Sequence, residues 1–133
     1  MTDDDPYLAR LRTICLALPG AVEGSSHGRP VFRTTKAFVS YRYGPKGGEH
    51  RPDHTLVVLP DPEDEAALRA DERFFVPAYL GSAGWLGTDL SDGGATAPDA
   101  VDWAEVAELV EASYRRTAPA RLVRELDAGE APA

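Results

Sequence analysis

The stretch from residue 28 to residue 60 constrains the fold of this chain most. It begins GRPVFRTTKAFVSYRYG, continues through a polar loop rich in glycine, and ends HTLVVLP. Its β-branched and aromatic residues partly alternate with polar ones, which favours β-strands over a helix. The run LVVL indicates that one of these strands is buried on both faces. We expect three strands here, over about 30–34, 36–43 and 54–59.

Three other segments have the features of helices. Apolar side chains recur at helical spacing in the first and the last of them, and the middle one opens with a proline and acidic residues. The first ends at Pro19-Gly20 and the last stops before Pro119. We expect helices over residues 4–18, 62–71 and 102–117.

A second pair of strands is expected after the middle helix, over Phe74–Leu80 and Trp85–Leu90. The four residues Gly81-Ser82-Ala83-Gly84 between them have the composition of a hairpin turn. Residues 21–30 are rich in turn formers and have room for one short strand. Residues 119–126 have room for a short turn that packs on the rest.

The order of these elements predicts an α+β fold. The order is α-β(3)-α-β(2)-α, in which a twisted five-stranded antiparallel sheet has helices packed on one face. With 133 residues, the chain is expected to form a single domain over residues 1–133. We expect an ordered core over about 4–122 and a frayed tail over 127–133.

The composition argues against several classes of protein. No apolar run approaches the ~18 residues of a membrane-spanning helix, so no membrane partner is expected. The acidic start MTDDDP is not followed by the apolar segment of a secretory signal, and a cytoplasmic location is expected. The single cysteine, Cys15, cannot form an internal disulfide and is expected to lie in the core.

Charge is distributed unevenly along the chain. The net charge is −8, yet residues 25–51 carry six Lys or Arg and only one acidic residue. Two interpretations are open: these cations contact phosphate while the acidic remainder opposes non-specific binding, or they only solvate the outer face of a sheet. The candidate nucleic-acid-binding residues are Arg29, Arg33, Lys36, Arg42, Lys46 and Arg51.

Three segments occur in an order that is typical of one known family. They are GRPVFRTTKAFVSY, then AGWLGTDL, then DWAEVAELVEASYRRTAP. With the helix before Pro19, they cover most of residues 7–122 and resemble the MmcQ/YjbR family of small bacterial proteins. The resemblance implies an α-β(3)-α-β(2)-α fold like that of type III secretion chaperones.

The resemblance also implies a function. The family is commonly labelled DNA-binding, with two β wings that present basic residues to double-stranded DNA. The wings would correspond to the strands of residues 28–60 and to the hairpin of residues 74–90, although the segment AYLGSAGWLGTDL of this second hairpin has no Lys or Arg. The alternative is a protein-interaction or small-ligand-binding module, whose surface would include the apolar segment AYLGSAGWLG.

Other residues that could carry chemistry give weaker patterns. His50 and His54 have the spacing of a helical zinc site, but Pro52 lies between them and prevents that helix. We therefore expect no metal, and no other cofactor. Trp85 and Trp103 are expected to pack inside. No nucleophile and base occur in a supporting pattern, so the chain is expected not to be an enzyme.

Overall fold

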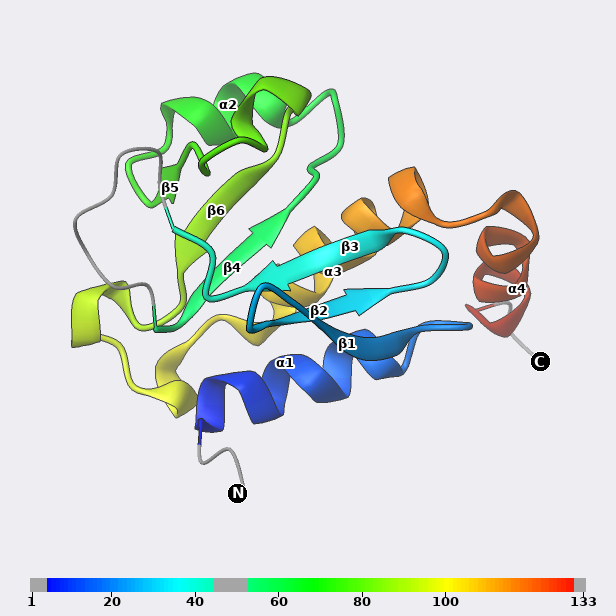
Figure 1. Cartoon of the computed structure of the whole chain (residues 1–133), viewed down its shortest axis with the longest axis horizontal. Coiled ribbons are helices and arrows are strands. Elements are labelled where there is room, and N and C mark those ends of the chain that lie inside the picture. Colours follow the sequence, from blue (N-terminus) through cyan, green and yellow to red (C-terminus); the bar gives the residue numbers. More distant parts are fainter. Residues whose placement is uncertain (1–4, 45–52, 131–133) are drawn as a thin grey trace.

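The computed structural model describes residues 5–44 and 53–130, which form an antiparallel sheet with helices against it (Figure 1). Six strands occur in the described residues, in the spatial order β1-β2-β3-β4-β6-β5. The strands are β1 Val22–Ser26, β2 Arg29–Arg33, β3 Ala37–Tyr41, β4 Thr55–Val58, β5 Phe74–Phe75 and β6 Leu86–Asp89. The α-helices are α1 Pro6–Leu16, α2 Glu65–Ala70, α3 Trp103–Thr117 and α4 Ala120–Glu130.

The α+β class and the antiparallel sheet are confirmed, but the prediction of five strands is wrong. The additional strand is β1, which pairs with β2 in full register from Val22↔Arg33 to Ser26↔Arg29. It lies in residues 21–30, where the sequence left room for one short strand, although VEGSS lacks the alternation that marks a half-buried strand. The turn that follows does carry a signal. His27 and Gly28 have φ angles of 52° and 78°, and two such residues make the two-residue turn that suits a tight hairpin.

The second hairpin also differs from the prediction. β5 contains only Phe74 and Phe75, and Pro77, two residues further on, has no N–H to donate to a neighbouring strand. The expected turn is a 3₁₀ helix, Gly81–Ala83, which is held by a bond from Gly81 N to Pro77 O. The connection from β5 to β6 is therefore a long loop.

Helices α1 and α3 cover one face of the sheet (Figure 1). Leu8, Phe32 and Tyr114 are fully buried between these layers, and the ring of Phe38 meets Tyr114 edge to face at 5.4 Å. Ser113 links α3 to two strands, because its hydroxyl donates to Phe38 O at 2.5 Å and accepts from Leu59 N at 2.9 Å.

The C-terminal part of the chain is more ordered than expected. Helix α4 runs through Glu130, so residues 127–130 are helical, while 131–133 lie outside the described residues. Leu122 is buried in the core, and Val123 and Leu126 pack against it. None of the helices in the two described stretches is both long and apolar enough to cross a membrane.

Candidate nucleic-acid interface

Three of the candidate cations lie on β2 or in the turn after it. Phe32 points into the core between sheet and helices, so its neighbours along β2 point to the opposite face. The positions of Val31 and Arg33 agree, because a Cβ built on Gly24 would lie 3.8 Å from Val31 Cγ2 and 3.6 Å from Arg33 Nε. Arg29 is two residues before Val31 on the same strand, so its side chain points to the same face as Val31 and Arg33. We call Arg29, Arg33 and the nearby Lys36 the β2 cations.

The β2 cations have no carboxylate partner in residues 5–44 and 53–130. The guanidinium of Arg29 lies over the ring of Tyr43, 4.6 Å from its centroid. Arg33 makes one long hydrogen bond, from Nη1 to Thr34 O at 3.5 Å. Lys36 is exposed in the turn before β3. Their charges are therefore available to an anion.

Arg42 has a different environment from the β2 cations. It follows β3 with a φ of 61°, which turns the chain, and its Nη2 lies 3.1 Å from Asp5 Oδ2. Its Nε also donates to Asp53 O at 3.3 Å. Arg42 thus binds an internal carboxylate. Lys46 and Arg51, the remaining two candidates, lie outside the described residues.

Asp5 is the centre of a polar cluster that the charge pattern of the sequence did not select. The carboxylate is buried at the start of α1, and Oδ1 accepts from the backbone N–H groups of Tyr7 and Leu8 at 3.0 and 3.1 Å. Oδ2 is 2.8 Å from Tyr41 Oη and 3.1 Å from both Arg42 Nη2 and His54 Nδ1. The cluster therefore joins the N-terminus of α1 to β3 and β4.

The electrostatics of this cluster favour the ionised carboxylate. Burial alone would raise the pKa of Asp5, but the hydrogen bonds from Tyr41, Leu8 N and Arg42 and the electrostatic interaction with His54 outweigh it. The pKa of Asp5 consequently lies below its ordinary value. The only sequence signal for the cluster was the pair Asp5-Pro6, because its other members are distant along the chain.

His54 is held as a structural partner. Its ring lies 4.4 Å from that of Tyr7, and Nδ1 is 3.1 Å from Tyr41 Oη as well as from Asp5. His50, the other histidine of the predicted spacing, lies outside the described residues. Within the described residues, no group of three His, Cys, Asp or Glu side chains could hold a metal ion.

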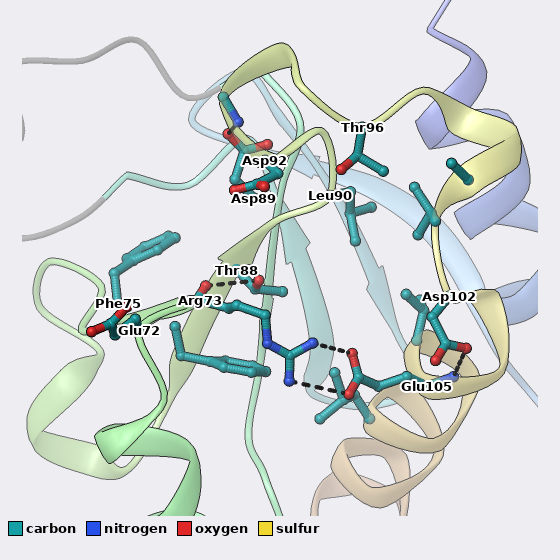
Figure 2. A pocket seen from close by; sticks show the side chains of 16 residues that line it. Glu72, Arg73, Phe75, Thr88, Asp89, Leu90, Asp92, Thr96, Asp102 and Glu105 are labelled. Atoms are coloured by element: carbon teal, nitrogen blue, oxygen red, sulfur yellow. Dashed lines mark hydrogen bonds and ion pairs between the residues drawn. The ribbon is translucent and has the colours of Figure 1, made fainter.

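A separate cleft of about 420 Å³ opens between the β5–β6 end of the sheet and α3 (Figure 2). Arg73 points across it, with Nη1 3.0 Å from Glu105 Oε1. Several of its carboxylates are already bonded within the protein: Asp89 accepts from Ser91 N and Gly93 N, and Asp102 caps α3 by accepting from Glu105 N. The lining is acidic overall, which suits a cation rather than phosphate.

The other residues considered from the sequence have packing roles. Cys15 is buried, and burial, with the charge of Glu23 as a smaller cause, raises the pKa of its thiol, so its prediction as a core residue is confirmed. Trp103 packs against the core and donates from Nε1 to Pro98 O at 2.8 Å. Trp85 is half-buried after the 3₁₀ helix.

The fold and the site define a small α+β protein whose β2 strand carries Arg29 and Arg33 on the face opposite its helices, without a carboxylate partner among the described residues. The family model YjbR matches residues 16–116, and the chain belongs to the YjbR family, as the resemblance indicated. No curated protein and no solved structure matches the chain. The matched span includes the β2 cations, whereas Asp5 and α4 lie outside it.

Proposed function

We propose that this protein binds the phosphate backbone of nucleic acid through the β2 cations. The observation that carries the proposal is that these three charges have no carboxylate partner within residues 5–44 and 53–130, in a protein with an excess of carboxylates. Elsewhere in the described residues, most arginines form ion pairs. The pairs are Arg10–Asp99, Arg12–Glu23, Arg42–Asp5, Arg69–Glu65, Arg73–Asp71, Arg73–Glu105, Arg115–Glu111 and Arg115–Asp127.

The spacing of the β2 cations suits a duplex. Arg29 and Arg33 are four residues apart on one strand, which separates their Cα atoms by roughly 13 Å. That distance is about four base-pair steps of ~3.4 Å measured along the axis of a duplex. The two guanidinium groups would therefore meet phosphates that are several nucleotides apart, and the acidic remainder of the surface would oppose other modes of contact.

Fluorescence anisotropy with a labelled 20-base-pair duplex at low salt tests the proposal. The double variant Arg33→Ala/Lys36→Ala removes two phosphate contacts, and we expect it to weaken binding about tenfold. Arg124→Ala is the control, because Arg124 is exposed on α4 and its loss also lowers the positive charge. Equal affinities of wild type and the double variant would contradict the proposal, and so would a wild type that binds neither this duplex nor a single strand of the same length.

The cleft of Figure 2 favours a second candidate, a module that binds a small ligand. Its volume of about 420 Å³ lies in the range of small-molecule sites, and its acidic lining suits an organic cation. A rise in melting temperature with millimolar spermidine, absent in a Glu105→Gln variant and accompanied by no nucleic-acid binding, would favour this candidate over the β2 cations.

A further inference from the structure

Tyr79 is the most exposed large hydrophobic side chain in the described residues, and its backbone is strained. Its side chain is 94% exposed and its φ is 65°. Leu80 N donates to Ala78 O at 2.7 Å, which closes a three-residue turn around Tyr79. A positive φ at the centre of such a turn is the rare and strained form. Strained backbone conformations of this kind cluster at functional sites, so a tyrosine in this conformation points to a functional role for its side chain.

The segment that carries Tyr79 is fixed against the strand end near Arg29. Tyr43 Oη donates to Ala78 O at 2.6 Å, and Ala78 N donates to Gly44 O at 3.2 Å. The ring of Tyr43 is in turn covered by the Arg29 guanidinium. Tyr43 thus contacts both the Arg29 guanidinium and the backbone of Ala78, the residue before Tyr79. We call Arg29, Tyr43 and Tyr79 the aromatic platform. It connects the loop between β5 and β6 to the β2 cations.

We propose that the aromatic platform stacks unpaired bases, so that the preferred ligand is single-stranded nucleic acid. This inference rests on the proposed function and specifies its ligand. In a duplex the bases stack on one another and cannot cover an exposed ring, whereas a single strand can place a base on Tyr79. Arg29 belongs to both groups, so one strand can have a base on the platform and its phosphates on the β2 cations. This arrangement of aromatic rings beside cations is the one that binds single strands without sequence preference.

The loop between β5 and β6 explains how the second wing could contribute without Lys or Arg. It supplies an aromatic ring, while the strands of residues 28–44 supply the charge. The alternative is that a protein partner covers the exposed ring of Tyr79. The neighbouring unpaired cations favour an anionic polymer over a protein surface at this position.

The test compares a 12-nucleotide deoxythymidine strand with a 12-base-pair duplex, using wild type and two variants. Tyr79→Gly removes the ring and also relieves the positive φ, so the fold is expected to remain intact or to melt higher. We expect it to weaken single-strand binding about tenfold and to leave duplex binding unchanged. Tyr79→Phe keeps the ring and is expected to bind the single strand as wild type does.

The outcomes separate this inference from the proposed function. Wild type that binds the duplex at least as tightly as the single strand, or a Tyr79→Gly variant with unchanged single-strand affinity, overturns the platform and leaves the β2 cations as proposed. Weaker single-strand binding by Tyr79→Gly, with none caused by Arg33→Ala/Lys36→Ala, supports the platform and overturns the phosphate contacts. Absence of binding to both ligands overturns both proposals.

Discussion

A single side chain, Asp5, determines how the first helix meets the sheet. Its carboxylate accepts two backbone N–H groups of α1 and also bonds to side chains of β3 and β4 or their ends. Those contacts make it more than a helix cap. They also remove Arg42 from the set of free cations, so one of the six residues that the charge pattern selected stabilises the fold.

The pKa of Asp5 predicts an acid-dependent loss of stability. Because the folded state lowers this pKa below 3.8, the ionised carboxylate stabilises the protein above about that pH and ceases to do so as the pH falls through the folded value. Asp5→Asn should lower the free energy of unfolding by about 2 kcal/mol at pH 7, the range of hydrogen bonds to charged groups.

Urea unfolding at pH 7 and at several values below 3.8 measures this effect. The difference between wild type and Asp5→Asn should shrink as the pH falls, since the wild-type carboxyl then becomes neutral as well. Asp61→Asn is a matched control, because Asp61 is exposed and bonds only to a neighbouring backbone N–H. A difference that stays constant with pH would show that the charge of Asp5 does not stabilise the fold.

At the scale of the strands and helices, the pairing of β5 with β6 depends on a glycine. Phe75 lies opposite Gly87, and a methyl group built on Gly87 would be 2.4 Å from Phe75 Cζ. The ring therefore covers the glycine across the two strands, which is a known way to support a glycine in a sheet. β5 has only two residues, so this contact is a large part of what holds the edge strand.

Gly87→Ala is expected to destabilise the protein by about 1–3 kcal/mol, the usual cost of overpacking. Phe75→Ala in the same chain should remove the clash, so the double variant should lose less stability than the sum of the single changes. Gly24→Ala is the control, since its methyl group would meet Arg33 Nε at an ordinary 3.6 Å. Additive losses in denaturant unfolding would contradict the contact.

The sequence predicted the helices and strands that have a clear local pattern. It missed those that depend on contacts between residues far apart along the chain. The helices near residues 6–16 and 103–117 follow from apolar spacing and capping residues, and the three central strands follow from their composition. β1 could not be predicted from its own polar residues, because its pairing with β2 defines it. The strand expected over Phe74–Leu80 is shorter because Pro77 has no N–H, Ala78 N donates to Gly44 O and Leu80 N donates to Ala78 O.

The candidate site was likewise predictable only in part from the sequence. A charge count selected a basic region, and β2 places Arg29 and Arg33 on one face. The count could not show that Arg42 meets Asp5, since 36 residues separate Asp5 from Tyr41, the nearest of its distant partners along the chain. Tyr79 was part of an apolar segment with no further feature, and its exposure depends on a turn that only the structure describes.

For the whole molecule, the separation of charge predicts how binding depends on salt. Six phosphate contacts would give a slope near −5 in a plot of log affinity against log salt, and the three β2 cations alone give about −2.7. Replacing Arg33 and Lys36 with alanine should reduce the magnitude of the wild-type duplex slope by about 1.8. Fluorescence anisotropy titrations between 25 and 200 mM salt, roughly the range in which salt lowers such affinities, measure this slope. Lower affinity with an unchanged slope would mean that these side chains do not contact phosphate.

Helices α1 and α4 contribute to the core, and this has a practical consequence for the design of truncated fragments. The family model ends at residue 116 and starts at residue 16, yet Leu8 and Leu11 before it and Leu122 after it are buried. A fragment cut to the matched span would expose the apolar surfaces that these leucines cover, including the one beside Gly20. A fragment meant for expression should therefore extend beyond the matched residues 16–116 at both ends.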